Sequence, residues 1–539
     1  MRMVPSKESL HDFWEAMRGT KLLEGHPVLT HPCEAAPAAR RGTFRDWAVP
    51  LSLHVDGVPV TGVGKAWSKT LDVYSWCSLL AKGITVHFNF WIWSVFIGLI
   101  SNGVYNTKNT FWKILSWSFY WLYRGLWPDR DWRGVPYTSG IDFVRRLKPL
   151  ADGYFGVLWV VKSDLEALTK EFGLPNYNSN DLCSWCPCHT HTMNPFEFRE
   201  EHSEWRRNVI TKTQWAMSPY RFHSIFSIPG VAILTFFPDF MHCKHLGCDM
   251  YALASILYII VYQILNYGSP NANMTYLFEK IKTIYARDNT PTQFSNITVS
   301  MFTSEREPGV RMPKLSGRAA EVRYLNFPLR EIWRELMDRR NMQHVQIECL
   351  LNLSCQMEDL LNHYDSSVRF PAVKANEFLQ TCMKYLICYN ALGYFYSEVA
   401  QPRQMLFDMV PKCHMLAHCG LKALEINPRL CWCYAGEDFM HTCKRVTSRC
   451  VVGNKGAQAT KKFCQMYRMG LHLMLADNDH AYVPVPWRKK LWVQLWVWER
   501  PLKSFSQKHV SFKFLINIQN INILNLWENK AKMMCLWVA

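Results

Sequence analysis

The chain has 539 residues, of which 49% are hydrophobic and 19% are charged. This composition excludes an intrinsically disordered protein, and the length suffices for about two to four structural units around a large buried core. The formal net charge is +17. Such a charge favours a polyanionic partner, because basic groups that neutralise phosphates release counterions. A basic soluble protein without such a partner is the alternative that charge alone leaves open.

The 19 cysteines are better explained by metal binding or core packing than by disulfides. The first residues, MRMVPSKESLHDFWEAMRG, lack the apolar core of a secretory signal. We therefore expect a reducing compartment, where clustered Cys and His are zinc ligands or small buried hydrophobes. Three scattered cysteines, Cys355, Cys382 and Cys388, are expected in the core.

The first 150 residues predict a short extension followed by a sheet. Residues 1–45 contain a short helical segment and a loop rich in Pro, Ala and Arg. Residues 46–95 contain apolar, β-branched runs typical of strands, the first of which carries Asp56 in PLSLHVDGVPVTG. Residues 96–150 predict a Trp-rich helical connection.

The next segments change from strand to helix periodicity. Residues 151–240 contain an apolar strand that ends before Asp164, in GVLWVVKSDLEAL, then a cysteine cluster and a further expected strand in GVAILTFFPDF. From about residue 245 to 425, apolar residues recur at helical spacing and strand signals are few. Residues 426–475 carry Glu437 at the start of an amphipathic helix, and 476–539 form a divergent tail to which we assign no function.

Two apolar stretches, ITVHFNFWIWSVFIGLI and MYALASILYIIVYQIL, invite a membrane interpretation. Each is shorter than the roughly 20 uninterrupted apolar residues that span a bilayer. The first also contains His87 and Asn89. We expect both to be buried elements, the first as strands of the sheet and the second as a buried helix, so no membrane partner is expected.

Three acidic residues lie in three separate predicted elements. Asp56 and Asp164 lie in or just after apolar strands, and Glu437 lies at the start of an amphipathic helix. Carboxylates that converge repel one another unless divalent cations lie between them, so a converging set implies Mg²⁺ or Mn²⁺. Each acid also has a purely local explanation. Asp56 with its following glycine is typical of a hairpin turn, Asp164 of a helix N-cap, and Glu437 of a first helical turn.

A second set of residues has the spacing of a zinc site. Cys183 and Cys186 match a half-site of the Cys-x-x-Cys type, and His414 and His418 lie one helical turn apart. Together they supply the four ligands of a tetrahedral site. Spacing does not choose between these ligands and three nearby competitors, which are Cys188, His189 and His191.

The flanking sequences give these residues a family resemblance. The string LSLHVDGVP, followed by YSWCSLLAKG, resembles the first catalytic strand of CACTA-type (En/Spm) DNA transposases of the CMC superfamily. The second acid is followed by a cysteine element, DLCSWCPCHTH. Further on, FPDFMHCKHLGCDMY supplies Asp239 and His242, and KCHMLAHCG supplies the histidine pair about twenty residues before Glu437. We expect Asp239 and His242 to form a structural hydrogen bond or salt bridge rather than to catalyse.

The order of these elements is also similar to that of the related V(D)J recombinase catalytic subunit. There, a Cys pair and a His pair bracket a large insertion and the Glu follows. The resemblance covers about residues 45 to 475.

This resemblance implies an α/β fold with a ribonuclease-H-like mixed sheet, interrupted by a large all-helical insertion. Residues 46–244 would form the first part of the core with the cysteine cluster, 245–425 the insertion, and 426–475 the helix that completes the core. The implied activity is metal-dependent DNA cleavage and strand transfer by a DDE transposase in the nucleus. Two Mg²⁺ or Mn²⁺ ions would bind Asp56, Asp164 and Glu437, with Asp56 as the bridging ligand, beside a structural Zn²⁺. The implied partners are transposon ends, target DNA and further copies of the chain.

Two other functions remain open. Residues 1–45 are too short for the N-terminal DNA-binding module expected of an autonomous transposase, and the tail is unfamiliar, so a catalytically inactive, transposon-derived DNA-binding or scaffolding relic is one alternative. The high aromatic content, with 23 Trp and 30 Phe, leaves an aromatic-rich membrane-associated protein as a distant one.

Overall fold

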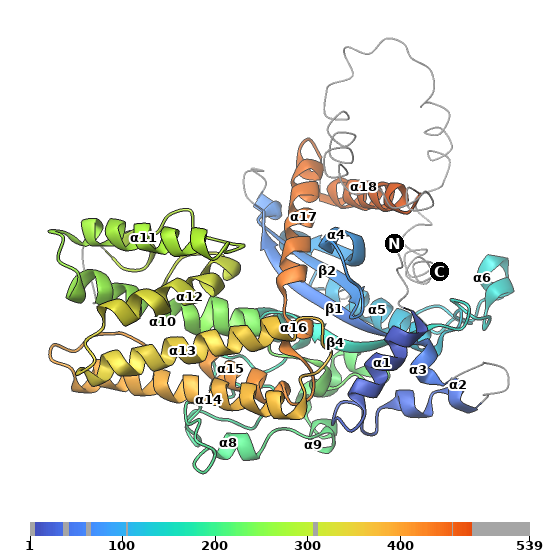
Figure 1. Ribbon diagram of the computed structural model, residues 1–539. Coiled ribbons are helices and arrows are strands. Elements are labelled where there is room, and N and C mark those ends of the chain that lie inside the picture. The colour runs from blue at the N-terminus through green and yellow to red at the C-terminus, as the bar shows by residue number, and fades with distance from the viewer. Residues whose placement is uncertain are drawn as a thin grey trace, which may run out of the picture.

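A mixed sheet lies at the centre of an α/β fold (Figure 1). The computed structural model describes residues 6–35, 43–60, 66–103, 106–304, 311–454 and 456–476. The divergent tail expected over 476–539 therefore lies, apart from its first residue, outside the described residues. Within the described residues the sheet has four strands in the spatial order β3-β2-β1-β4. Their bounds are β1 (Ala48–Pro59), β2 (Thr70–Ser78), β3 (Phe90–Phe96) and β4 (Phe155–Lys162).

The strand pairing makes the sheet mixed. β1 runs antiparallel to β2, and β2 antiparallel to β3, whereas β1 runs parallel to β4. The apolar first two thirds of β1 are buried and its last residues alternate between partly buried and exposed. A parallel pair needs a crossover connection, and the chain between β3 and β4 supplies it with α5 (Thr107–Arg124) and α6 (Gly140–Arg145).

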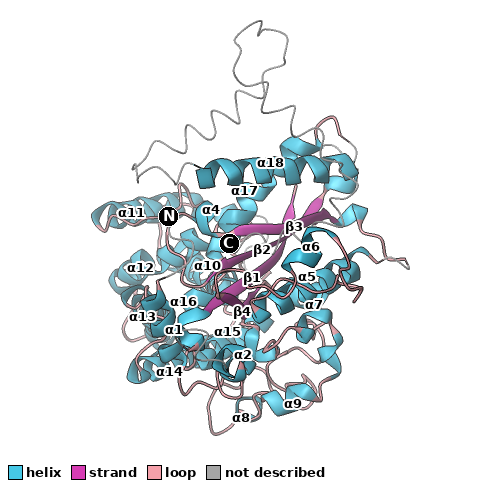
Figure 2. Cartoon of the chain, turned by 90° about the vertical axis from the view of Figure 1, so that its right-hand side faces the viewer, coloured by secondary structure: helices cyan, strands magenta, loops and turns pink. Residues whose placement is uncertain are grey.

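Helices cover both faces of the sheet (Figure 2). On one face, Trp112 and Phe119 of α5 join Tyr74 of β2 in one apolar cluster. Successive side chains of a strand point to opposite faces. The neighbouring Val73 accordingly belongs to a different cluster, with Phe439 of α17 (Tyr434–Val451) and residues of α18 (Gly456–Ala476). The helix that carries Glu437 thus crosses the face opposite α5.

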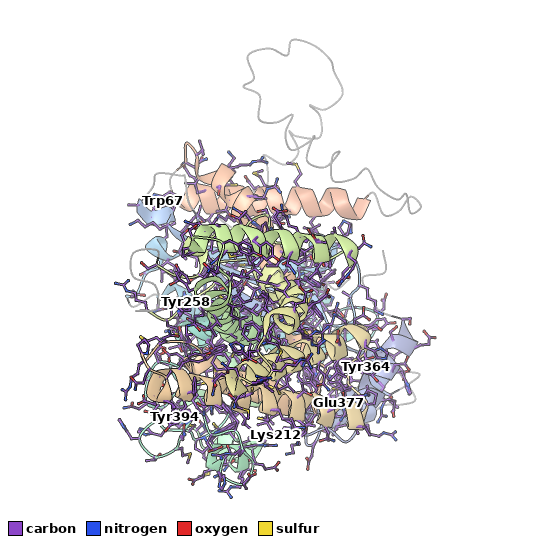
Figure 3. The ribbon with its side chains drawn as sticks, turned by 60° about the vertical axis from the view of Figure 1, so that its left-hand side comes forward. Trp67, Lys212, Tyr258, Tyr364, Glu377 and Tyr394 are labelled. Atoms are coloured by element: carbon purple, nitrogen blue, oxygen red, sulfur yellow. The ribbon has the colours of Figure 1, made fainter. Side chains whose placement is uncertain are left out.

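The N-terminal segment is part of the packed structure. Trp14 of α1 (Lys7–Met17) is buried against Trp159 of β4, with ring centroids 5.1 Å apart. Its indole Nε1 donates a 2.8 Å hydrogen bond to the carbonyl oxygen of Ala48, where β1 begins. Farther along the chain, Lys212 (Figure 3) donates hydrogen bonds to backbone oxygens of residues that follow α1. These contacts anchor the extension to the sheet.

Long helices predominate where the sequence periodicity predicts them. They are α10 (Asp249–Ile259), α11 (Pro270–Arg287), α12 (Ala319–Leu336), α13 (Met342–His363), α14 (Ala372–Tyr394) and α15 (Pro411–Lys422). In Figure 1 most of them stack to the left of the sheet, coloured green to orange. One apolar cluster runs without interruption from sheet residues into these helices. The helical segment is therefore packed onto the sheet rather than tethered to it.

Shorter elements complete the described structure. The short α-helices are α2 (Pro32–Ala35), α3 (Phe44–Trp47), α4 (Thr85–Phe88), α7 (Leu165–Phe172), α8 (Glu204–Arg207), α9 (Lys212–Ala216) and α16 (Pro428–Cys431). The 3-10 helices are η1 (Pro27–Thr30), η2 (Ala66–Ser68), η3 (Ile97–Leu99), η4 (Pro219–Phe222), η5 (Ser224–Ser227), η6 (Ile233–Thr235) and η9 (Val299–Met301). The π-helical segments are η7 (Met241–Cys248), η8 (Ile260–Ile264) and η10 (Phe395–Val399).

The strand expected in GVAILTFFPDF does not form. Its centre is η6, and only Phe236 pairs with β4, in an isolated parallel bridge to Val161. Prolines 229 and 238 flank the segment and cannot donate to a ladder. The hydroxyl of Thr235 accepts a hydrogen bond from the Ala232 amide, which turns the backbone instead of extending it.

Of the two apolar stretches, the second is buried as expected, whereas only the middle of the first is a buried strand and the short helices α4 and η3 that flank it contain no buried residues. The first contains β3. The second forms α10 and η8, within the segment Met241–Ile264, which is kinked at Leu246 and Gly247 but is long and apolar enough to cross a membrane. Of its most apolar window, 72% is buried inside the protein, and it is the one such helix among the described residues.

Candidate functional site

The register of the parallel strands brings Asp56 and Asp164 to one edge of the sheet. The last paired residues of β1 and β4 are His54 and Lys162. Asp56 lies two residues beyond His54, and Asp164 lies two residues beyond Lys162. Because the carboxyl ends of parallel strands meet at the same edge, both aspartates lie near one edge, Asp56 in the last part of β1 and Asp164 just after β4.

Glu437 reaches the same place from the first turn of α17. Its amide donates a 2.8 Å hydrogen bond to the carbonyl oxygen of Cys433. The preceding residue, Gly436, packs against His54 so closely that a methyl group there would lie 2.5 Å from the imidazole Nε2. Only glycine permits this approach of the helix to β1. The carboxylate of Glu437 is consequently held over the end of the strand.

Three ligand atoms, one each from His54, Asp56 and Glu437, lie within 4.8 Å of one another. Burial, the charge and hydrogen bond of Glu437 and the charge of Asp164 raise the pKa of Asp56 well above its usual range. Burial, followed by the charges of Asp239 and Asp164, raises the pKa of Glu437, although its hydrogen bond with Asp56 opposes the shift. The carboxylates repel one another, as a cation-binding group does without its cation.

His54 itself is buried, with 4% of its surface exposed. Burial, with smaller effects of the Lys162 and His242 charges, lowers the pKa of its imidazole to about 3. The ring is therefore neutral at physiological pH and keeps a lone pair for a metal ion.

A second group adjoins these acids and consists of Asp239, His242 and Cys433. Asp239 Oδ2 accepts a 2.5 Å hydrogen bond from Nδ1 of His242, and Oδ1 accepts one of 2.9 Å from the Cys433 amide. The expected structural hydrogen bond between Asp239 and His242 is therefore present. Nε2 of His242 lies 3.7 Å from Oε1 of Glu437. Burial alone would lower the pKa of His242, but the hydrogen bond and charge of Asp239, with the charges of Asp56 and Asp164, raise it.

The local explanations of the three acids have different outcomes. Asp56 is not in a hairpin turn, because it pairs with Val73 inside the β1–β2 ladder, and the ladder continues to Pro59. Asp164 is an N-cap: its Oδ1 accepts a 2.6 Å hydrogen bond from the Ala167 amide at the start of α7. Glu437 does lie in a first helical turn. The local roles of Asp164 and Glu437 do not prevent their carboxylates from lying beside that of Asp56.

The predicted zinc ligands form a compact buried group. Cys183 Sγ lies 3.3 Å from His418 Nε2, Cys186 Sγ lies 3.4 Å from His414 Nε2, and the two Nε2 atoms are 3.2 Å apart. The edges of a tetrahedron with Zn–N and Zn–S bonds of ordinary length are roughly 3.3 to 3.8 Å. The group is therefore compatible with a bound metal ion. It joins the cysteine loop after β4 to α15.

The hydrogen-bond partners of this group also suit a metal. Nδ1 of His414 donates a 2.9 Å hydrogen bond to the carbonyl oxygen of Pro195, which leaves Nε2 as the ligand atom. Burial alone would raise the pKa of the Cys183 thiol. A hydrogen bond from Cys186 and the charges of the two histidines nevertheless hold that pKa well below its ordinary value.

The competing ligands lie outside this group. Cys188 is buried and its thiol contacts that of Cys186, but it does not share the four-residue cluster. The rings of His189 and His191 pack on each other with centroids 5.4 Å apart. The structure thus favours His414 and His418 over the three alternatives.

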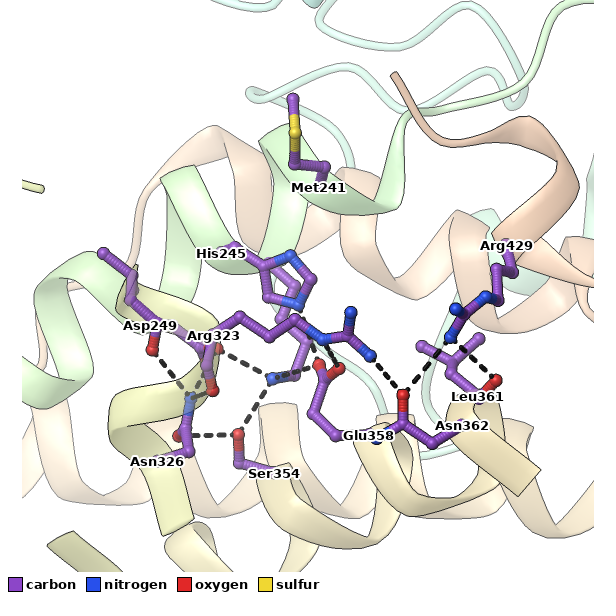
Figure 4. Close-up of polar contacts among 12 residues, drawn as sticks. Met241, His245, Asp249, Arg323, Asn326, Ser354, Glu358, Leu361, Asn362 and Arg429 are labelled. Atoms are coloured by element: carbon purple, nitrogen blue, oxygen red, sulfur yellow. Dashed lines mark hydrogen bonds and ion pairs between the residues drawn. The ribbon is translucent and has the colours of Figure 1, made fainter. Parts of the chain in front are cut away.

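A buried ionic network connects the acid site to the long helices (Figure 4). The hydroxyl of Tyr434, at the start of α17, donates a 2.8 Å hydrogen bond to Nδ1 of His245, whose Nε2 donates one of 2.8 Å to Glu358 on α13. The Glu358 carboxylate also contacts Lys244 at 3.1 Å and Arg323 of α12 at 2.6 Å. All partners of this carboxylate are cationic or hydrogen-bonding, as a buried charge requires.

No protein-family model matches this chain, and comparison with curated proteins finds no match.

Sequence reasoning missed two residues of the acid site, His54 and Cys433. His54 carried a usable signal, since it lies two positions before Asp56 on a strand and must share its face. Cys433 carried none, because its contribution is a backbone amide whose partner, Asp239, is distant in sequence.

Proposed function

We propose that this protein is a DDE-type transposase with a ribonuclease-H-like core, which cleaves DNA and joins the cut strand to a target. The observation that supports this most is the proximity of Asp56 and Glu437, with Asp164 near enough for its charge to act on both. These residues come from segments far apart in sequence, and the charges of Glu437 and Asp164 act on Asp56. Mutually repelling carboxylates are an expected property of a two-metal site.

The fold is compatible with the proposal. The family resemblance implies a mixed sheet with Asp56 on its first strand and Glu437 on a helix packed across it. The sheet and α17 have these positions. The long helices between the cysteine loop and Glu437 occupy the place of the implied insertion.

Two divalent ions at this site would polarise a water molecule or a DNA 3′-hydroxyl and neutralise charge on the scissile phosphate. The residues of the chain hold the oxygens that such ions require. The Gly57 amide donates a 2.6 Å hydrogen bond to Oδ1 of Asp56, and the Ala167 amide fixes Oδ1 of Asp164. His242, oriented by Asp239, places a nitrogen 3.7 Å from Glu437. Since phosphoryl transfer depends mostly on positioning and charge neutralisation, no covalent protein intermediate is needed.

We further propose that the group formed by Cys183, Cys186, His414 and His418 binds Zn²⁺. Its ligand atoms are buried and have tetrahedral separations. An ion there would fix α15 to the cysteine loop and so keep the helical segment on the sheet. A closed four-ligand site of this type is structural rather than catalytic.

The partners and location follow from the same proposal. The net charge of +17 suits transposon ends and target DNA, whose binding to Lys and Arg weakens steeply with salt. Joining two ends to one target favours a homo-oligomer, and the substrate places the protein in the nucleus.

The test is a cleavage assay with purified protein and duplexes carrying the inverted repeats that flank its own gene. With Mg²⁺ or Mn²⁺ we expect nicking and strand joining. Glu437→Gln should reduce both by at least about a hundredfold and leave DNA binding nearly unchanged, because it keeps the shape and removes the metal-binding charge. Asp438→Asn, which changes the exposed neighbouring acid on the same helix, is the matched control and should retain activity.

Two other outcomes have clear meanings. Salt-sensitive DNA binding without metal-dependent cleavage of verified ends would identify a transposon-derived relic instead of an active enzyme. If neither binding nor cleavage is found, the proposal is wrong.

A further inference from the structure

His54 lies in the acid site, where neither ring nitrogen has a hydrogen-bond partner in the part of the chain that the structure describes. It is two residues before Asp56 on β1, so both side chains leave the same face of the sheet. One of its ring nitrogens lies within 4.8 Å of ligand oxygens of Asp56 and Glu437. Neither Nδ1 nor Nε2 has a hydrogen-bond partner among the described residues, although both atoms are buried.

This lack of a partner requires an explanation. Burying an imidazole nitrogen without a hydrogen bond costs free energy, and native structures contain few such groups. The histidines of the other two groups have hydrogen-bond partners: His242 bonds Asp239, His414 bonds the Pro195 carbonyl, and Nε2 of His418 contacts Cys183. An unsatisfied nitrogen next to two carboxylates is the arrangement that a shared cation would complete.

Gly436 packs against the face of the His54 ring and not against its edge. A methyl group at Gly436 would be 2.5 Å from Nε2 and 2.6 Å from both Cδ2 and Cε1 of His54. A point in the ring plane beyond Nε2 would be much farther from the two carbons, so Gly436 lies over the face of the imidazole. The helix therefore clamps the ring without covering the nitrogens at its edge.

We propose that His54 is a protein ligand of the divalent cation held by Asp56 and Glu437, and that it makes this site prefer Mn²⁺ to Mg²⁺. The inference rests on the metal site of the proposed function. Mg²⁺ takes oxygen ligands in strict octahedral geometry and keeps its water, whereas first-row transition ions accept imidazole nitrogen. A carboxylate, carboxylate and imidazole set therefore discriminates between the two ions.

The experiment uses the full-length, zinc-loaded protein with MnCl₂ alone as the probe. Electron spin echo spectroscopy of bound Mn²⁺ should show ¹⁴N coupling, which His54→Gln removes. The same variant should weaken Mn²⁺ binding about tenfold or more and weaken Mg²⁺ binding less. His223→Gln is the control, because Nε2 of His223 also lacks a partner among the described residues but the residue is outside the acid group. It should change neither measurement.

Several results would overturn the inference. Mn²⁺ that binds in a Glu437-dependent manner but shows no ¹⁴N coupling excludes a histidine ligand. Unchanged Mn²⁺ affinity and coupling in His54→Gln excludes His54. Should this variant not fold, His242→Gln decides: retained coupling supports His54, and lost coupling assigns the nitrogen to His242.

The two proposals fail separately. His54-dependent Mn²⁺ binding without cleavage of the cognate ends would contradict only the proposed function. Cleavage that depends on Glu437, together with Mn²⁺ binding that does not depend on His54, would contradict only the inference.

Discussion

At the scale of single residues, two groups of side chains that could hold a metal ion differ in their exposure. The four Cys and His residues are fully buried, and their ligand atoms already have tetrahedral separations. In contrast, Glu437 keeps 39% of its side chain exposed, and its carboxylate raises the pKa of Asp56. The first group is suited to hold an ion permanently. In the second group the carboxylates are partly exposed and the pKa of Asp56 is raised by its charged neighbours, so an ion there would exchange more readily.

The zinc proposal predicts one zinc ion per chain and its loss on Cys183→Ser. Without the ion, the buried thiol and imidazoles lose the ligand that compensates their burial, so the midpoint of thermal denaturation should fall by at least about 5 °C. Metal analysis and calorimetry measure both effects. Cys188→Ser is the matched control and should keep its zinc; zinc loss in that variant would show that the fourth ligand is assigned wrongly.

At the scale of elements, the first turn of α17 places Glu437 through successive contacts. The Cys433 amide bonds Asp239, the Tyr434 hydroxyl bonds His245, and Gly436 packs on the His54 ring. The first two partners precede α10, and the third lies on β1. These contacts reach both the sheet and the segment that precedes the long helices. The position of the Glu437 carboxylate therefore depends on the correct packing of the sheet against those helices.

Gly436→Ala should separate α17 from β1. Alanine favours a helix over glycine by about 1 kcal/mol, but the added methyl group would overlap the buried His54 ring. We expect a net loss of about 1 to 3 kcal/mol in unfolding free energy, measured by urea denaturation, together with weaker Mn²⁺ binding. Gly470→Ala on α18, where nothing lies within 4 Å, should be neutral or stabilising. Equal behaviour of the two variants would refute the close approach.

At the scale of the whole molecule, one buried ionic network joins the helices to each other and to the acid site. Glu358 of α13 contacts Lys244 of η7, Arg323 of α12 and, through His245, the start of α17. Burial alone would raise the pKa of Glu358, but the charges of Lys244, His245 and Arg323 hold it well below its usual range. Removal of one member of such a network leaves its partners buried and uncompensated.

Glu358→Gln should therefore lower the unfolding free energy at pH 7 by about 3 to 5 kcal/mol. The folded-state pKa is depressed, so the stabilising contribution of Glu358 is complete above its unfolded pKa of about 4.3 and is lost as pH falls through the folded value. The difference between wild type and variant should accordingly shrink below about pH 4. Urea titrations at several pH values measure it. Glu279→Gln, which removes an exposed partner of Lys282, should cost about 0.5 kcal/mol or less at any pH.

The sequence by itself determined the local features. Apolar runs predicted β1, β3 and β4, helical periodicity predicted the long helices, and residue type at a helix start predicted the Asp164 cap. The spacing of His414 and His418 placed both on one face of α15. Each of these depends on interactions between residues that are close in the chain, so the pattern carries the information.

Only the tertiary structure decided which of these pieces meet. The apolar segment before Pro238 matched a strand pattern yet forms η6, because flanking prolines and a Thr235 turn outweigh its composition. Likewise, the roles of His54 and Cys433 depend on α17 docking across β1. The register of β1 with β4 and the docking of α17 arise from contacts between residues more than a hundred positions apart. No local pattern records such contacts, which is why the acids could be named in advance but the contribution of the Cys433 amide could not.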